Sequence, residues 1–300
     1  MALIDATPGM VMVSSSQGRL LYMNGVGRQM LGIGTQTSIA ARTVFDIYSP
    51  QSCDTLLDEA IPTCLRSGIW RGEMTLLDNA GAEVPVSQVL MAHRVREQHG
   101  RETTTLSSIA WDIREMKDIE RQLRHQATHD ALTGLPNRML LLDRLEHAIV
   151  VAERKGGAVG VLFLDLNGFK QVNDSLGHEM ANQLLCALGR RLAARVRAED
   201  TIARYGGDEF VLVIPDLATP EDTARVTRQV RQAVEETFAM GREMVRLEAS
   251  IGVAVYPHDG RDAGALLRRA DGRMYEQKSR ARGDAPADGH PPGGDPLAAA

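Results

Sequence analysis

The chain has 300 residues, of which 43% are hydrophobic and 24% are charged, and its formal net charge is −5. This composition is typical of a soluble globular protein, and the small negative charge gives no reason to expect nucleic-acid binding. The length favours two domains, and no run of about 18 apolar residues predicts a membrane span. Because the N-terminus also lacks the basic start and apolar core of a signal peptide, we expect a cytoplasmic protein.

Residues 1–111 are expected to form short strands, turns and one or two helices. Apolar runs predict strands at 10–13, 19–24, 70–77, 83–92 and 105–112, with a polar loop at 94–104 and a helix at 51–66. The order of these elements resembles a PAS sensor domain, which has an antiparallel sheet with flanking helices. The stretches that carry this resemblance are "LIDATPGMVMVSSSQGRLLYMN", "IWRGEMTLLDNAGAEVPV" and "SIAWDIRE".

The resemblance to PAS domains leaves the ligand open, because such domains bind haem, flavin, small metabolites or nothing. The predicted helix at 51–66 contains no histidine that could bind haem iron. The cysteine motif of the flavin photoreceptors is absent as well. The PAS ligand is therefore unknown from the sequence.

The polar stretch 112–127 favours a helix that would link two domains. Its heptad-like seam, with one polar interruption, consists of Ile113, Met116, Glu120, Leu123 and Ala127. This seam is compatible with a short coiled coil and with a single amphipathic helix packed on one neighbour.

The C-terminal half alternates predicted helices and strands. A helix capped by Asn137 and running to about 154, a second ending near 197, and others at 221–238 and 262–278 are expected around strands at 158–164 and 249–257. The strand 158–164 is almost wholly apolar, as a central strand should be, and Asp165 directly follows it. A carboxylate there could bind a metal ion or simply cap the turn.

A second pair of carboxylates follows a Gly-Gly turn. Predicted strands at 201–203 and 211–214 flank Gly206-Gly207, which indicates a tight hairpin. Asp208 and Glu209 come next and would repel each other unless a cation lay between them. Mg²⁺ that carries substrate phosphates takes such ligands. A plain surface hairpin is the alternative for the glycines alone.

From about Thr128 to Arg282 the chain resembles the GGDEF-type diguanylate cyclases. The resemblance is carried by "HDALTGLPNR", "RYGGDEF", "SIGVAVYP" and "ADGRMYEQK". It implies a mixed α/β (α+β) chain whose C-terminal domain has a central mixed sheet surrounded by helices, like the palm of nucleotidyl cyclases. It also implies an Mg²⁺- or Mn²⁺-dependent enzyme that converts two GTP into cyclic di-GMP and two pyrophosphates, as a homodimer coupled through the linker helix.

The resemblance assigns expected roles residue by residue. Metal ligands would be Asp165, Leu166 through its carbonyl, Asp208 and Glu209, and the catalytic acids would be Asp208 and Glu209. Substrate would be bound by Phe169, Lys170, Asn173, His178, Asn182, Gly206, Gly207, Lys278 and Arg282. Cyclic di-GMP would inhibit through Arg197 and Asp200, although Arg-x-x-Asp alone is usually a solvated surface pair.

One departure from the family pattern concerns the expected guanine site. Where the family usually has Gly-Asp, this chain has Ala181-Asn182. A carboxylate can accept hydrogen bonds from both guanine N–H groups, whereas an amide has one acceptor oxygen and a donor NH₂. Two alternatives therefore stay open beside the cyclase, namely a weakly active receptor for GTP or cyclic di-GMP and a cyclase with relaxed purine specificity.

The expected domain organisation has four parts. They are a PAS-like sensor domain at 1–111, a linker helix at 112–127, a GGDEF catalytic domain at 128–283 and a disordered tail at 284–300, which is rich in Pro, Gly, Ala and Asp.

Overall fold

The computed structural model describes residues 7–96, 102–217, 220–241 and 243–282. The chain divides into two compact units, Met1–Gln122 and Leu123–Ala300, hereafter the N-terminal and C-terminal units. None of the helices in the described ranges combines the length and hydropathy that a membrane span requires. The expected disordered tail at 284–300 lies outside the described residues.

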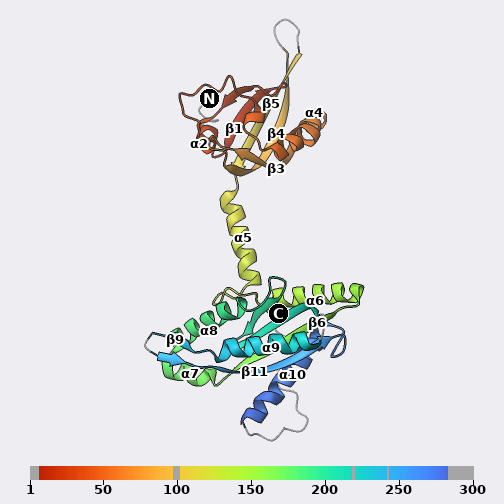
Figure 1. The fold of residues 1–300 in the computed structure, drawn as a ribbon. Coiled ribbons are helices and arrows are strands. Elements are labelled where there is room, and N and C mark those ends of the chain that lie inside the picture. The colour runs from red at the N-terminus through yellow and green to blue at the C-terminus, as the bar shows by residue number, and fades with distance from the viewer. Residues whose placement is uncertain (1–6, 97–101, 218–219, 242, 283–300) are drawn as a thin grey trace. The chain divides into compact units, whose positions relative to one another are not determined.

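The N-terminal unit is built on a five-stranded antiparallel sheet in the order β2-β1-β5-β4-β3 (Figure 1). The strands are β1 (Met10–Ser15), β2 (Leu20–Met23), β3 (Ile69–Leu77), β4 (Glu83–Arg96) and β5 (Glu102–Asp112). The helical segments are α2 (Gly25–Met30), η1 (Val44–Asp46), α3 (Pro50–Thr55), the π-helical turn η2 (Leu56–Ala60) and α4 (Ile61–Ser67). One apolar core joins the helices to the inner face of the sheet.

The polar loop that we predicted at 94–104 is too long, because both neighbouring strands extend into it. Strand β4 continues to Arg96 and β5 begins at Glu102. The two strands stay paired as far as Arg96 and Glu102. Backbone pairing thus extends the ladder beyond the apolar residues that reveal strands in a sequence.

Helix α5 (Arg114–Thr128) follows the N-terminal sheet, close to the predicted linker helix. None of its residues is buried within the single chain, and the apolar side chains of Met116, Ile119 and Leu123 are 53%, 48% and 60% exposed. Its apolar stripe is therefore available for contact with another surface.

The C-terminal unit has a four-stranded sheet in the order β11-β6-β8-β7 (Figure 1). Its strands are β6 (Ala158–Asn167), β7 (Thr201–Gly206), β8 (Glu209–Leu217) and β11 (Glu248–Tyr256), and β9 (Phe238–Met240) pairs with β10 (Glu243–Val245) in a separate ribbon. The helices are α6 (Arg138–Lys155), α7 (Phe169–Leu176), α8 (His178–Ala193), α9 (Pro220–Glu235) and α10 (Ala263–Arg282).

Helices cover both faces of this sheet. Residues of α8 and α9 form a core with Leu162 and Leu164, whereas α6 and α10 pack on Val161 and Phe163. Successive residues of a strand point to opposite faces, so the apolar run of β6 supplies both cores. This arrangement confirms the predicted α/β fold class. The expectation of a mixed sheet is wrong in one respect, because all three pairings between its strands are antiparallel.

Three helix and strand boundaries differ from the sequence prediction. A separate helix α7 carries Asn173, because Gly177 (φ 83°) interrupts the chain before α8. Helix α8 ends at Ala193 instead of near 197. Helix α9 ends at Glu235, and Phe238 starts β9 instead of closing the helix.

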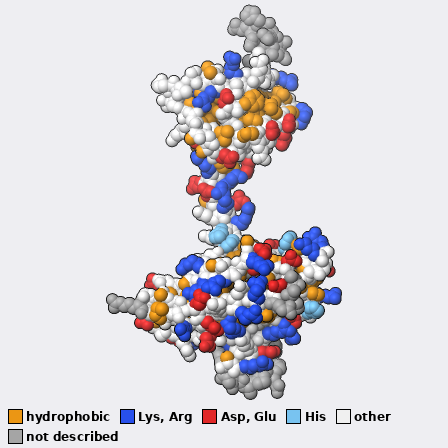
Figure 2. Space-filling model, in the orientation of Figure 1, with side chains coloured by type: hydrophobic (Ala, Val, Ile, Leu, Met, Phe, Trp, Pro, Cys, Tyr) orange, Lys and Arg blue, Asp and Glu red, His pale blue; other side chains and the backbone are white. Residues whose placement is uncertain are grey.

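The surfaces of the two units differ in character. Figure 2 shows hydrophobic side chains gathered on the visible face of the N-terminal unit, whereas the visible face of the C-terminal unit mixes basic and acidic side chains.

Candidate active site

The predicted Gly-Gly hairpin joins β7 and β8. Thr201 pairs with Val213 and Gly206 with Glu209, and the register shifts between Arg204 and Gly206. Gly207 and Asp208 form the turn, and Gly207 has a φ of 48°, which residues with a Cβ rarely adopt. The turn therefore needs glycine at 207 and leaves the chain on either side free to approach a ligand.

A partly buried ion pair holds this hairpin to the segment that opens the C-terminal unit. Arg204 donates hydrogen bonds to the Gly207 carbonyl at 2.9 and 2.7 Å and to Asp130 at 3.0 and 3.1 Å. Asp130 also accepts from Thr133 N and Oγ1 at 2.8 and 2.7 Å. Asp130 thus has a structural role, since it locks the segment after α5 to the hairpin.

Asp165 lies beside the hairpin because β6 pairs with β8. Asp165 is directly opposite Glu209 in this ladder, and the Leu166 amide donates to the Asp208 carbonyl at 3.4 Å. Asp165 is 7% exposed and lies in the strand, which continues to Asn167, and not just beyond its end as the sequence suggested. Sheet pairing therefore brings together the carboxylates that are 43 or more positions apart in the sequence.

A fourth acid completes a group that we call the carboxylate cluster, namely Asp165, Asp208, Glu209 and Asp271. Burial, then the charges of Asp165, Asp271 and Asp208, raises the pKa of Glu209 to about 7. Burial and then Asp165 likewise raise the pKa of Asp208 and that of Asp271. The cluster holds more negative charge than its surroundings offset.

The one cation in direct contact with this cluster, among the described residues, is Lys278 of α10, which makes a short ion pair with Asp165. No three His, Cys, Asp or Glu side chains in the described part of the chain are close enough together to form a ready-made metal site. The donor set nevertheless fits Mg²⁺ or Mn²⁺, because it consists of carboxylate oxygens whose mutual repulsion a divalent cation would relieve. Asp165, Asp208 and Glu209 are the residues that would hold it.

Sequence analysis missed Asp271. It precedes Lys278 by seven positions, or about two helical turns, so both residues lie on the same face of α10. That spacing was a usable signal, since Lys278 was already a predicted site residue.

The predicted phosphate-binding residues lie at the start of α7. Gly168 (φ 72°) is the N-cap of this helix, and Phe169 and Lys170 form its first turn. The first amide groups of a helix have no partner within the helix and favour anions. Gly206, Gly207 and the half-buried Asp208 form the neighbouring edge of the site.

The two predicted guanine contacts differ in their surroundings. Asn173 Oδ1 is buried without a hydrogen-bond partner among the described residues, so it is able to accept a hydrogen bond from a ligand. Asn182 is exposed on α8, in a groove that Leu132 and Cys186 also line. Asn173 does not line that groove, so this structure does not place the two residues in one pocket. His178 is the exposed first residue of α8.

Arg282 is the last residue of α10, and its side chain lies outside the described part of the structure.

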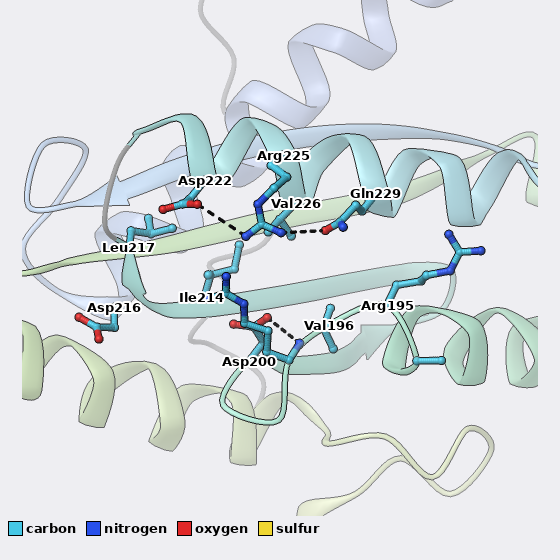
Figure 3. Close-up of a pocket in the computed structure, with 12 residues that line it drawn as sticks. Arg195, Val196, Asp200, Ile214, Asp216, Leu217, Asp222, Arg225, Val226 and Gln229 are labelled. Carbon is cyan, nitrogen blue, oxygen red and sulfur yellow. Dashed lines mark hydrogen bonds and ion pairs between the residues drawn. The ribbon is translucent and has the colours of Figure 1, made fainter.

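The predicted inhibitory residues border a pocket of about 190 Å³ next to α9 (Figure 3). Asp200 Oδ2 accepts from the Arg197 amide at 2.9 Å, whereas Oδ1 is buried without a described partner. Burial raises the pKa of Asp200. Figure 3 shows Arg225 and Gln229 of α9 across this pocket from Asp200. The Arg197 side chain is exposed and pairs weakly with Glu199 at 3.8 Å.

Residues 127–284 match the family described as "Diguanylate cyclase, GGDEF domain". Among curated proteins, the chain is 48% identical over 162 residues to the bifunctional diguanylate cyclase/cyclic di-GMP phosphodiesterase MucR of Pseudomonas aeruginosa, covering 54% of this chain and 24% of MucR. It is 39% identical over 159 residues to the response regulator PleD of Caulobacter vibrioides, covering 52% of this chain and 35% of PleD. The chain thus spans well under half of these relatives.

Solved structures give the same picture. A GGDEF-only form of TpbB from Pseudomonas aeruginosa superposes with a TM-score of 0.50 at 35% identity, covering 52% of this chain and 91% of that one. The coiled coil and GGDEF domain of DgcB from Caulobacter crescentus, solved with c-di-GMP, gives a TM-score of 0.51 at 25% identity, covering 57% and 90%. The chain therefore belongs to the GGDEF diguanylate cyclase family.

Proposed function

We propose that this protein is a metal-dependent diguanylate cyclase that condenses two GTP molecules into cyclic di-GMP and two pyrophosphates. The observation that carries the proposal is the carboxylate cluster. Its acids meet at a glycine hairpin whose turn leaves space for a ligand, and their raised pKa values indicate a deficit of positive charge. A site of this kind suits a cation and a triphosphate.

Asp165, Asp208, Glu209 and the Leu166 carbonyl hold the cation. When bound, Mg²⁺ or Mn²⁺ neutralises charge on the substrate phosphates. The Asp208 carboxylate accepts the proton of the attacking 3′-hydroxyl. The 3′-oxygen then bonds to the α-phosphorus of the other GTP, and pyrophosphate leaves.

The remaining predicted residues bind GTP. The α7 amides around Phe169 and Lys170 hold phosphate oxygens, and Lys278 and Arg282 supply positive charge. The glycines at 206 and 207 allow close approach. Asn173 pairs with guanine through its unpartnered Oδ1, and His178 and Asn182 complete the substrate site.

Each site binds one GTP, so the reaction requires two C-terminal units that face each other. Helix α5 brings the two chains together as a homodimer, and its exposed apolar stripe of Met116, Ile119 and Leu123 supports this role. The N-terminal unit is a PAS sensor that controls the encounter in the cytoplasm. We retain the boundaries 1–111, 112–127 and 128–283 for the three parts.

Cyclic di-GMP inhibits the enzyme through Arg197 and Asp200. The unpartnered buried oxygen of Asp200 supports a ligand at this pocket, because guanine offers N–H donors to such an atom. Arg197 is exposed and free to turn towards a phosphate.

The test is turnover of the purified protein with Mg²⁺ and GTP, followed by GTP with ATP, with the products resolved by mass. We expect cyclic di-GMP from the wild type and none from Asp208→Ala. Absence of product from folded, dimeric wild type would reject the cyclase.

A second candidate, favoured by Asn182 alone, is a receptor that binds GTP or cyclic di-GMP with little turnover. Glu209→Ala separates the two proposals, because a product receptor keeps its ligand binding in that variant whereas a cyclase loses its product. A mixed dinucleotide from GTP with ATP would instead indicate relaxed purine specificity at Asn182.

A further inference from the structure

The N-terminal unit contains a pocket of about 120 Å³ between the inner face of its sheet and its helical segments. The sheet contributes Met12 and Ser14 from β1, Leu90 from β4, and Leu106 and Ser108 from β5. The turn after β1, the helical segments and the connection between η1 and α3 contribute Ser16, Gln17, Gly18, Val44, Phe45, Tyr48, Leu56, Leu57 and Ile61. None of these described lining residues carries a charge.

The floor of the pocket has a hydroxyl group with unused hydrogen-bonding capacity. Ser108 is 1% exposed, and its Oγ has no described partner besides the adjacent Tyr48 hydroxyl. The Tyr48 hydroxyl donates a hydrogen bond to Gln88 Oε1 at 2.8 Å, while Gln88 Nε2 is buried without a described partner. A serine hydroxyl can donate one hydrogen bond and accept two, so Ser108 Oγ can still accept a hydrogen bond from a ligand.

The wall opposite the sheet is irregular. Leu56 and Leu57 line the pocket from η2, a π-helical turn between α3 and α4. Such turns are rare and are often found at functional sites. Leu57 is 49% exposed and Phe45 is 42% exposed, so both of these lining side chains also reach the surface of the unit.

These features define the chemistry of an occupant. The volume is slightly less than that of a cavity of roughly 150 Å³ that holds benzene. It is too small for haem or flavin. An ionised ligand would lose its hydration without gaining a partner of opposite charge. An apolar body with one hydrogen-bonding group would instead match the leucine lining and the Ser108 hydroxyl.

We propose that this pocket binds a small, neutral, aromatic molecule of about the size of benzene, with one hydroxyl group that pairs with Ser108 Oγ. Binding removes apolar ligand surface from water, and the ligand hydroxyl donates a hydrogen bond to Ser108 Oγ. The site lies wholly within the N-terminal unit and does not depend on the proposed cyclase chemistry.

The experiment is a saturation-transfer NMR titration of the full chain with phenol, benzene and benzoate at pH 7. We expect saturable binding of phenol, weaker binding of benzene and no binding of benzoate. In Ser108→Ala, the phenol dissociation constant should rise roughly tenfold while that of benzene is unchanged. The matched control is Ser87→Ala, on the β4 position opposite Trp111 of the outer face, which should leave both constants unchanged.

Three results would overturn the proposal, provided that circular dichroism shows folded protein. They are an absence of saturable phenol binding, benzoate binding as tightly as phenol, or equal phenol affinities in Ser108→Ala and wild type. Because the readout is binding and not turnover, an inactive cyclase would leave the result interpretable.

Discussion

The main sheets of the two units differ in the charge of the polar groups that they bring together. In the C-terminal unit, ionisable side chains gather where β6 meets the β7–β8 hairpin, and they repel one another. In the N-terminal unit, the neutral groups of Ser108 and Gln88 on the inner face of the sheet lie with Tyr48 among apolar side chains. The first arrangement suits the cation and charged substrate that we propose, whereas the second suits the small neutral ligand proposed for the N-terminal pocket.

The largest expected effect is the loss of one acid from the carboxylate cluster. Asp165→Asn keeps the shape of the side chain but removes a charge that would hold the cation and that contacts Lys278. We expect turnover to fall roughly 1,000-fold, measured as cyclic di-GMP formed by mass spectrometry. Asp143→Asn, at an exposed position of α6, is the control. Equal turnover in the two variants would show that the cluster is structural.

The ion pair that anchors the hairpin should contribute to stability. Burial alone would raise the pKa of Asp130. Hydrogen bonds from Thr133 and Arg204 outweigh this effect and hold the pKa below its usual value. Asp130→Ala leaves Arg204 without this partner, and we expect about 2 kcal/mol lower stability of the C-terminal unit. This loss of stability is measured by urea unfolding, monitored by circular dichroism, with Asp143→Asn as the control. No change in the unfolding midpoint would contradict the role of this pair.

A comparable change in the N-terminal unit should cost less. Tyr48→Phe removes the proton that Gln88 Oε1 accepts, so we expect a loss of about 1–2 kcal/mol. Both tryptophans, Trp70 and Trp111, lie in this unit, so their fluorescence during urea unfolding reports on it. Tyr275→Phe, at a 49% exposed position, should leave the curve unchanged. Identical curves for both variants would mean that the buried hydrogen bond contributes nothing.

Substitution of the amide at position 182 should strengthen GTP binding, whereas the substitutions above weaken activity or stability. Asn182→Asp supplies a second acceptor for the guanine N–H groups, and we expect the KM for GTP to fall roughly tenfold while that for ATP rises. Gln183→Glu adds the same charge one residue further along α8 and should have little effect. If the ratio of the KM for ATP to the KM for GTP is the same in Asn182→Asp and wild type, the guanine site lies elsewhere.

The last prediction concerns the dependence of stability on pH. The fold favours the protonated form of Glu209, whose pKa rises from 4.5 to about 7. In metal-free protein this contribution to stability is complete below about 4.5 and is lost as pH rises through about 7. Thermal unfolding across this range should therefore show a smaller decline in Glu209→Gln than in wild type. Glu146→Gln, on the exposed face of α6, should behave as wild type does, and a decline of the same size in Glu209→Gln would contradict the assignment.

The sequence predicted the C-terminal site better than the N-terminal pocket for a physical reason. The hairpin depends on Gly207, and the central strand on a run of apolar residues, so both features appear in the local sequence. Sheet pairing then brings Asp165 to Glu209. Asp271 joins the cluster through the packing of α10, and its spacing from Lys278 is its one signal in the sequence.

The N-terminal pocket could not be predicted in this way. Ser108 looks like any strand serine, and its burial beside Tyr48 depends on the register of β5 with β4 and on the π-helical turn at Leu56. Neither feature has a local signal. The boundaries of α8 and α9 also depended on tertiary contacts, such as the packing of Arg191 on the ring of Phe238 at 3.6 Å.

The central claim is that the carboxylate cluster, loaded with a divalent cation, joins two GTP molecules. The most direct measurement follows GTP, cyclic di-GMP and pyrophosphate together over time, first with Mg²⁺ and then after EDTA is added. We expect two pyrophosphates for each cyclic di-GMP and an immediate stop when the metal is removed. Folded protein that makes no cyclic di-GMP with Mg²⁺, or that continues to make it without metal, would contradict this claim.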